Sequence, residues 1–418
     1  MAENADEDDL FWYDEQGDSD SENEMTDEDS LLQAIEKNDL AKAENLLGIK
    51  GVSPNFERRG RSPICRVACL GYNDMLELLI SKQSCLTTSC QGDTMWLRHP
   101  IHLAASKGFP NIVKRLVECG VDINSKDSDH RTPLHWAATY GHTDTAQLLL
   151  QKGAVVNVTQ TDGFTPLHAA TCLGHLNVCK VLIDNGADVN RVDAEGWTAL
   201  HTAVCYGQPQ VVELLLENRS TVKALTLDQN TTLHVAASSG YLSVMEILLT
   251  HDLDLNRRNM QGFTPFHLAF YHSKIDACKL LIKHGVDIQT TDLNGQSPLY
   301  LAAARMNVKL VHLLLESGYD FSKEKWIRDK QFPFVVQKLP ALCEMLIETA
   351  SNPKSLQYIT CFKIRNLISG NIVPKIESLP IPNSLIDILA FKCGQFSEEN
   401  NSEKVAFFST IQQAWVYT

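Results

Sequence analysis

The sequence predicts an all-α solenoid built of stacked helix pairs, and three patterns point to this fold. A tetrapeptide similar to Thr-Pro-Leu-His recurs every 33 residues, beginning at positions 99, 132, 165, 198, 231, 264 and 297. Each recurrence precedes two short stretches with the apolar spacing of helices. Turn residues separate these stretches at fixed places. A constant period of this length is typical of a repeat array, which offers a long binding surface rather than a catalytic pocket.

The unit that starts at Thr165 shows how each element is encoded. Gly163 tolerates the positive φ that a tight turn needs. Thr165 suits the N-cap of a first helix, and Pro166 suits its first position, where a missing N–H costs nothing. Gly174 ends that helix, and the apolar stripe at 176–183 predicts a second one. Because no unit can bury its apolar faces alone, we expect stability to come from stacking.

The repeats are predicted to occupy most of the chain. Residues 30–98 form two irregular amino-terminal units, the first starting near Ser30 and the second at Ser62. Residues 99–335 form the regular units, and the stretch from Trp326 to Phe334 is a degenerate cap. This organisation amounts to about nine repeats.

Residues 1–29 are predicted to be an acidic, disordered tail. They hold 14 of the 51 acidic residues and no Lys or Arg, while the other 37 acidic residues balance 37 Lys and Arg. Such a charged segment cannot offset the entropy of ordering. Its Leu-Phe-Trp-Tyr cluster at 10–13 is either a sticky patch kept soluble by acidic neighbours or a short docking motif. The neutral body offers no basic stripe of the kind that nucleic-acid binding needs.

Composition also bears on the compartment. The amino-terminal sequence has neither the basic nor the apolar region of a signal peptide, and no run of about 18 apolar residues predicts a membrane span. The 12 cysteines include no Cys-x-x-Cys pair, and several, such as Cys172 and Cys278, fall on helix-packing faces. We therefore expect reduced core thiols and a location in the cytoplasm or the nucleus.

The repeat motifs resemble the ankyrin repeat. The resemblance is clearest at 163–168 (Gly-Phe-Thr-Pro-Leu-His) and at 186–190 (Gly-Ala-Asp-Val-Asn). It implies helix pairs joined by β-turn fingers and a protein-binding array. Three units depart from the pattern. Ala199 replaces Pro in one, the unit at 231 lacks both the Pro and the turn Gly, and Tyr300 replaces His in the last.

The carboxy-terminal part continues with further apolar helices. Residues 336–352 are predicted to be a linking helix, and Ser355 is the N-cap of a helix whose apolar face includes Leu356 and Ile364. A stiff Leu-Pro-Ile-Pro segment at 379–382 then precedes another apolar helix. One interpretation is a small cap on the end of the solenoid, but these elements exceed what a cap needs.

The same elements resemble a SOCS box, with both halves in order, at 353–392; residues 393–418 would be a carboxy-terminal extension. The resemblance implies an elongin-binding helix that uses Leu356, Thr360 and Ile364, with Thr360 standing where the family usually has Cys. It implies a cullin-5 contact made by Leu379, Pro380, Ile381, Pro382 and Leu385.

Array and box together resemble the ankyrin repeat and SOCS box family. This implies a non-catalytic substrate-recognition subunit of an elongin B/C–cullin-5–RING ubiquitin ligase. The array would bind an unidentified substrate protein and promote its ubiquitination and degradation. No cofactor, metal, nucleic-acid or membrane partner is expected. The alternative is an ankyrin scaffold that sequesters a partner without recruiting a ligase, and elongin binding separates the two.

Aromatic residues on the turn tips and first helices are candidate substrate contacts, because aromatics often anchor interfaces. They are Trp136, Tyr140, Phe164, Trp197, Tyr206 and Phe263. The alternative for Phe164, Trp197 and Phe263 is that they only shield the turns.

Nothing in the sequence predicts catalysis, since it contains no phosphate-binding loop, no metalloprotease motif and no nucleophile with an identifiable base. The histidines at 33-residue spacing, from His102 to His267, could suggest a metal ladder, but we expect them to tie neighbouring turns together. The asparagines at 124, 157, 190 and 256 resemble sites of an asparaginyl hydroxylase, but the same position is structural in the repeat.

Overall fold

The computed structural model describes residues 26–57, 62–87, 99–332 without 306, 318, 322 and 323, and 346–347. Within these residues the chain forms nine consecutive helix pairs, a short final helix and no strand. The predicted all-α solenoid is confirmed, including two pairs ahead of residue 99. Within the described part, no helix is both long enough and apolar enough to cross a bilayer.

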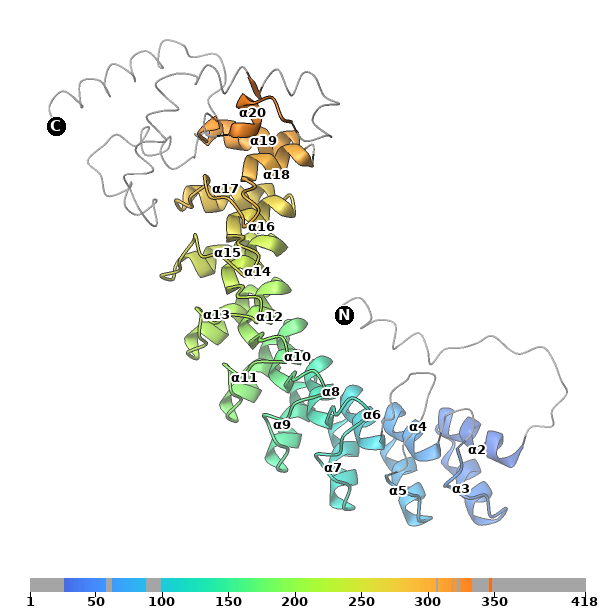
Figure 1. Cartoon of the computed structure of the whole chain (residues 1–418). Helices are drawn as coiled ribbons and strands as arrows, with labels where there is room; N and C mark the ends of the chain where they lie inside the picture. Colours follow the sequence, from blue (N-terminus) through green and yellow to red (C-terminus); the bar gives the residue numbers. More distant parts are fainter. Residues whose placement is uncertain are drawn as a thin grey trace, which may run out of the picture. The chain divides into compact units, whose positions relative to one another are not determined.

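Each pair contains a first and a second helix, labelled in Figure 1. The first helices are α2 (Asp27–Glu36), α4 (Pro63–Leu70), α6 (Pro100–Ser106), α8 (Pro133–Thr139), α10 (Pro166–Cys172), α12 (Ala199–Cys205), α14 (Thr232–Ser239), α16 (Pro265–Tyr271) and α18 (Pro298–Ala304). The second helices are α3 (Leu40–Gly48), α5 (Asn73–Ser81), α7 (Pro110–Glu118), α9 (Thr143–Gln151), α11 (Leu176–Asp184), α13 (Pro209–Glu217), α15 (Leu242–Leu249), α17 (Ile275–Lys283) and α19 (Val308–Glu316). The final helix is α20 (Lys325–Arg328).

The chain divides within α14, after Val235, into two units. In the first unit the first helices α4, α6, α8, α10 and α12 pack in one row, and the second helices α7, α9, α11 and α13 pack in another (Figure 1). In the second unit α16 packs on α18, and α17 packs on both α15 and α19. The helices in these rows therefore bury one face against their own pair and another against a neighbouring repeat.

The core repeats with the same period as the sequence. In the seven regular repeats the second residue of the first helix is at most 2% exposed, as seen in Ile101, Leu134, Leu167, Leu200, Leu233, Phe266 and Leu299. An alanine three residues further on is equally buried in most repeats. Burial of each large side chain stabilises the fold by about 1.5–3 kcal/mol. The small alanine lets neighbouring first helices approach closely.

The first helix begins earlier than the sequence predicted. It starts at Asp27 rather than near Ser30, because Thr26 caps it. The Thr26 hydroxyl accepts from the Asp29 N–H at 3.2 Å, and the Asp29 carboxylate accepts from the Thr26 N–H at 3.2 Å. Three acidic residues in the first turn also suit the positive end of the helix dipole. Acids that were assigned to the tail thus belong to the first helix.

The last repeat ends against an aromatic cluster. Tyr300, which stands where other repeats have His, meets Trp326 of α20 edge to face at 5.6 Å between ring centroids. Trp326 also packs against Phe332 at 5.8 Å, and its indole N–H donates to Glu324 at 2.5 Å. The described part of the stretch predicted to be a cap thus packs against the last repeat. Residues 1–25, the SOCS box and the extension at 393–418 lie outside the described residues, as does the linking helix apart from 346–347.

Candidate protein-binding surface

The fingers between repeats are held by a Thr-x-x-His link. The Thr165 N–H donates to His168 Nδ1 at 3.3 Å, and the Thr165 hydroxyl lies 2.8 Å from the same atom. Because Nδ1 accepts, Nε2 carries the proton, and it donates to the Trp197 carbonyl in the next repeat at 3.2 Å. The same Nε2 link joins His102 to Ser125 at 2.9 Å and His135 to Phe164 at 3.2 Å. The predicted structural role of these three histidines is confirmed.

Burial keeps these imidazoles neutral. It lowers the pKa of His102, His135, His201 and His267 to about 4. Where both ring nitrogens make hydrogen bonds, as in His135, neither is available to a metal. The part of the chain that the structure describes contains no group of His, Cys, Asp and Glu residues suited to a metal ion.

The repeated asparagines form a second link between fingers. The Asn157 side chain accepts from the Asp188 N–H at 2.9 Å and donates to the Gly186 carbonyl at 3.1 Å. The same acceptor position binds a backbone N–H of the next repeat in three other units, in the pairs Asn124–Val155, Asn190–Thr221 and Asn256–Asp287 at 2.7–2.9 Å. The structural role predicted for this position is confirmed.

The finger tips approach one another so closely that glycine is needed beside them. Gly163 has φ of +87°, and a Cβ added there would lie 2.9 Å from the Ala194 backbone nitrogen. That nitrogen donates to the Asp162 carbonyl at 2.9 Å. The tips are thus a continuous hydrogen-bonded edge within the first unit.

The six aromatic residues predicted as substrate contacts differ in exposure. Trp136 is only 2% exposed and donates to the Asp127 carboxylate at 3.0 Å, so we remove it from the proposed binding surface. Tyr140 stacks on Trp136 at 6.1 Å. Tyr206 is half-buried, and burial raises its pKa to about 12. A hydrogen bond between its hydroxyl and the Cys172 side chain adds a smaller contribution to this increase.

The remaining candidates lie beside the histidine of the Thr-x-x-His motif within their own repeats. Phe164, Trp197 and Phe263 are half-buried, with ring centroids 5.2–6.0 Å from His168, His201 and His267 respectively. They both shield these histidines and present part of each ring to solvent. The structure therefore accommodates both sequence interpretations at these positions.

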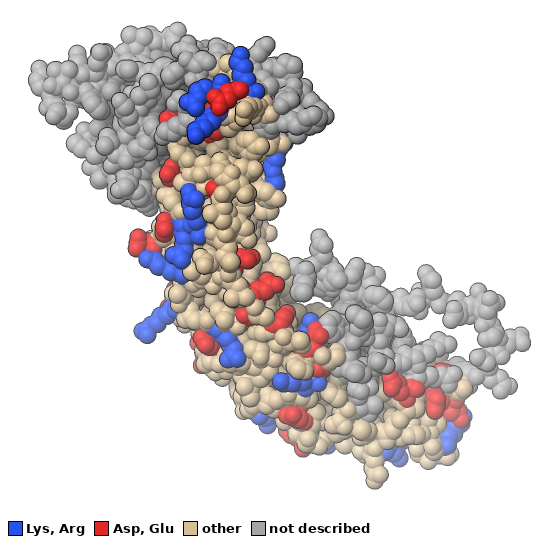
Figure 2. All heavy atoms as spheres, in the orientation of Figure 1, with Lys and Arg blue, Asp and Glu red and all other residues tan. Residues whose placement is uncertain are grey.

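The finger tips change in character along the array, a feature not predicted from the sequence. One tip position carries acids in four successive repeats, Asp129, Asp162, Glu195 and Asp228, and then neutral amides, Gln261 and Asn294. The preceding position is small at first and then becomes a large exposed apolar residue at Leu227, Met260 and Leu293, each 58–69% exposed. The 33-residue spacing of these residues was the available signal. On the face that Figure 2 shows, basic side chains are interspersed with acidic ones.

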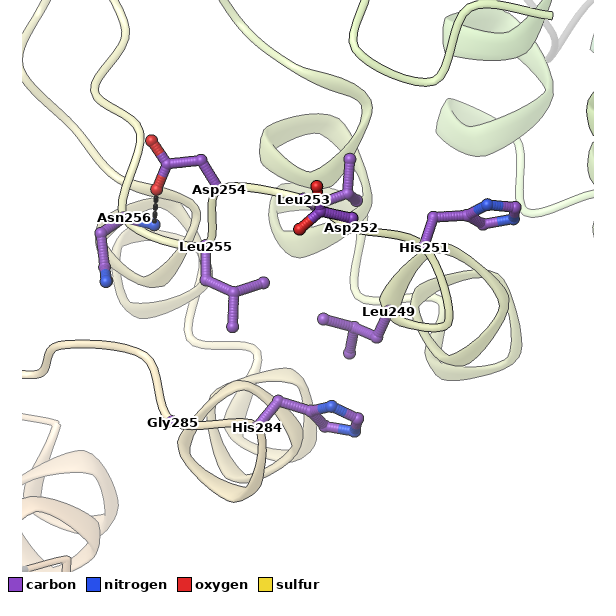
Figure 3. A pocket seen from close by; sticks show the side chains of 9 residues that line it. All are labelled: Leu249, His251, Asp252, Leu253, Asp254, Leu255, Asn256, His284 and Gly285. Atoms are coloured by element: carbon purple, nitrogen blue, oxygen red, sulfur yellow. Dashed lines mark hydrogen bonds between the residues drawn. The ribbon is translucent and has the colours of Figure 1, made fainter. Parts of the chain in front are cut away.

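A shallow pocket of about 290 Å³ lies where α15 ends. Here Asp252 stands where the 165 unit has Gly186, which has φ of +85°. The helix stops at Leu249, one position sooner than its counterpart α11. The Asp254 carboxylate accepts from the Asn256 N–H at 3.0 Å, and the side chains of Leu249 and Leu255 face the centre (Figure 3). The pocket lies at the end of this shortened helix, and its lining residues include no nucleophile with a base.

The cysteines largely follow the prediction. Cys172, Cys179 and Cys278 form no disulfide, and burial raises the pKa of each thiol, to about 12 for Cys172 and Cys179. These thiols therefore stay protonated at neutral pH. Cys65 is disulfide-bonded, so the expectation of reduced thiols is wrong at this position.

The residues predicted to contact elongin and cullin-5 all fall in 356–385, outside the described residues. Their assignment rests on the sequence. The structure contributes the folded array that precedes them.

The chain matches the models of two known families. Ankyrin repeats match in overlapping stretches at 31–127, 101–193, 155–225, 190–259 and 233–325. The SOCS box matches at 352–390. A search among curated proteins finds no match. A repeat solenoid with such a box defines the class of substrate adaptors of cullin–RING ubiquitin ligases, and both kinds of domain are non-catalytic. The chain belongs to the ankyrin repeat and SOCS box family.

Proposed function

We propose that this chain is the substrate-recognition subunit of a ligase assembled from elongin B, elongin C, cullin-5 and a RING protein. The observation that carries the proposal is the SOCS box at 352–390, carboxy-terminal to a folded repeat array. The array binds a target protein and the box binds the ligase. This arrangement raises the effective concentration of the charged ubiquitin-conjugating enzyme near substrate lysines, which leads to degradation.

The SOCS-box residues divide into two contacts. Leu356 inserts into an apolar pocket of elongin C, with Thr360 and Ile364 on the same helical face, as a helix docking in a groove. The Leu-Pro-Ile-Pro segment at 379–382 and Leu385 contact cullin-5. The prolines fix an extended backbone, which lowers the entropy lost on binding.

The test is capture of purified elongin B–elongin C by the full chain, followed by addition of cullin-5. Wild type is expected to retain both, and Leu356→Ala is expected to lose both. Leu242→Ala, which alters a leucine 39% exposed on α15, is the matched control and should retain both. A Pro380→Ala/Pro382→Ala variant should retain elongins and lose cullin-5. If wild type captures no elongin, the ligase proposal is wrong and the chain acts as a scaffold.

A further inference from the structure

The second unit carries an exposed apolar strip formed by Met260, Phe263, Tyr271 and Leu293. Met260 is 58% exposed, Tyr271 40% and Leu293 68%. The rings of Phe263 and Tyr271 lie 6.2 Å apart, which joins the finger to the end of α16. Leu293 packs against the backbone of Gly262, since a Cβ there would lie 2.6 Å from Leu293 Cγ. The strip therefore runs over two neighbouring fingers and one helix end.

An arginine is fixed at the end of this strip. The guanidinium of Arg305 lies 3.5 Å from the centroid of the Tyr271 ring, and it donates to the Tyr271 carbonyl. Stacking and hydrogen bonding hold the planar group in one orientation while its side chain stays exposed. A pre-oriented guanidinium loses little entropy when it binds a carboxylate through two parallel N–H donors.

Three cations, Lys274, Arg305 and Arg258, lie around the strip, together with the exposed Asp287 and the buried Asp292. Lys274 and Arg305 lie close to His272, where burial first and then these two cations lower the imidazole pKa. Arg258 is similarly close to His267, beside Asp287 and Asp292. Asp292 is only 4% exposed and accepts from the N–H groups of Asn294 and Gln296, so its carboxylate stabilises the backbone of the finger.

The tip residues reinforce this character. Gln261 and Asn294 occupy the position that carries Asp162 or Glu195 in the first unit. The strip therefore has no carboxylate at its tips to repel an acidic ligand. Apolar area next to an ordered arginine and aromatic rings is the composition of an interface hot spot.

We propose that the apolar strip and Arg305 bind an acidic segment of a substrate protein that carries apolar side chains. An apolar side chain packs on Met260, Phe263 and Leu293, and a neighbouring carboxylate pairs with Arg305. This inference rests on the proposed function, because it assigns a substrate class to the same array. Charge complementarity selects the acidic partner.

The test is fluorescence polarisation with the full chain and a labelled peptide, Glu-Asp-Glu-Leu-Trp-Leu-Asp-Glu-Asp. A peptide in which every acid is replaced by its amide is the ligand control. We expect wild type to bind the acidic peptide, and Arg305→Glu and Met260→Gln/Leu293→Gln each to bind it about tenfold more weakly. Arg191→Glu and Val155→Gln, which alter exposed residues of first-unit fingers, should bind within about twofold of wild type.

Thermal unfolding and elongin capture are measured for every variant. Unchanged values in both show that lost peptide binding is local, and they separate failure of this inference from failure of the ligase proposal. Equal binding by Arg305→Glu, or equal binding of the amide peptide, overturns the inference. Binding that appears only when residues 10–13 are replaced by alanine also overturns it, because the chain's own acidic segment would then be the occupant.

Discussion

His168 donates a hydrogen bond through Nε2 to the carbonyl oxygen of Trp197, 3.2 Å away in the next repeat. Its other nitrogen accepts from Thr165 within its own repeat. One side chain thereby couples the N-cap of a helix to the backbone of a neighbouring finger. Because a solenoid has few long-range contacts, such links between adjacent repeats contribute strongly to its cooperativity.

Replacing His168 with alanine is expected to destabilise the array by about 1–3 kcal/mol, because the buried Thr165 N–H loses its acceptor and the link to the Trp197 carbonyl is lost. The measurement is urea unfolding followed by circular dichroism. His251→Ala is the control, since His251 is exposed on the loop after α15. Equal midpoints for the two variants would show that the link contributes nothing.

Acidification is expected to weaken the fold through the same histidines. The pKa of His135 is about 4 in the folded chain and about 6.5 when unfolded. Between these values the unfolded state binds more protons, so stability falls as pH drops from about 6.5 to about 4. The loss approaches about 3 kcal/mol per histidine at the lower limit. The measurement is the urea midpoint at pH 7 and at pH 5. The difference between the two midpoints should be smaller for His135→Gln than for wild type.

Two glycines separate backbone strain from steric contact. Gly163 and Gly153 both have positive φ, at +87° and +95°, but only Gly163 has atoms close to where a Cβ would lie. Gly153→Ala is expected to cost about 1–2 kcal/mol from the left-handed backbone alone. Gly163→Ala should cost more, because the Ala194 nitrogen must move and its bond to Asp162 weakens. Chemical denaturation of both variants gives the difference in their free energies of unfolding. A smaller loss of stability for Gly163→Ala than for Gly153→Ala would contradict the close contact with Ala194.

The sequence predicted the elements whose signals are local. Pro166 begins α10, and the stripe at 176–183 matches α11 (Leu176–Asp184), because capping and periodicity act within a few residues. It did not predict the start of α2, since Thr26 and Asp29 were counted as part of a charged tail. A high charge density indicates disorder only where the charges have no helix terminus to stabilise.

The candidate surface was predictable only in part. Trp136 was expected to be exposed, but it is buried and its indole N–H donates to the Asp127 carboxylate. These residues are nine positions apart, so they meet only in the folded finger. The pairing of Arg305 with Tyr271 links residues 34 positions apart, so no local pattern indicates it. The Met260 and Leu293 tips, by contrast, follow the 33-residue register and could have been read from the sequence.

The aromatic contact at the end of the array leads to a final prediction. Tyr300 replaces the histidine that links other repeats to the next finger, and its ring meets Trp326. Trp326→Ala should therefore expose the end of the last repeat and increase hydrogen exchange in α18 and α19, with a loss of about 1–3 kcal/mol because the indole is half-buried. Arg328→Ala, on the same helix and exposed, is the control and should leave exchange unchanged. Protection in α8 and α10, which lie in the first unit, should stay at the wild-type level. If exchange in α18 does not increase, the short helix α20 is not the element that closes the core of the last repeat.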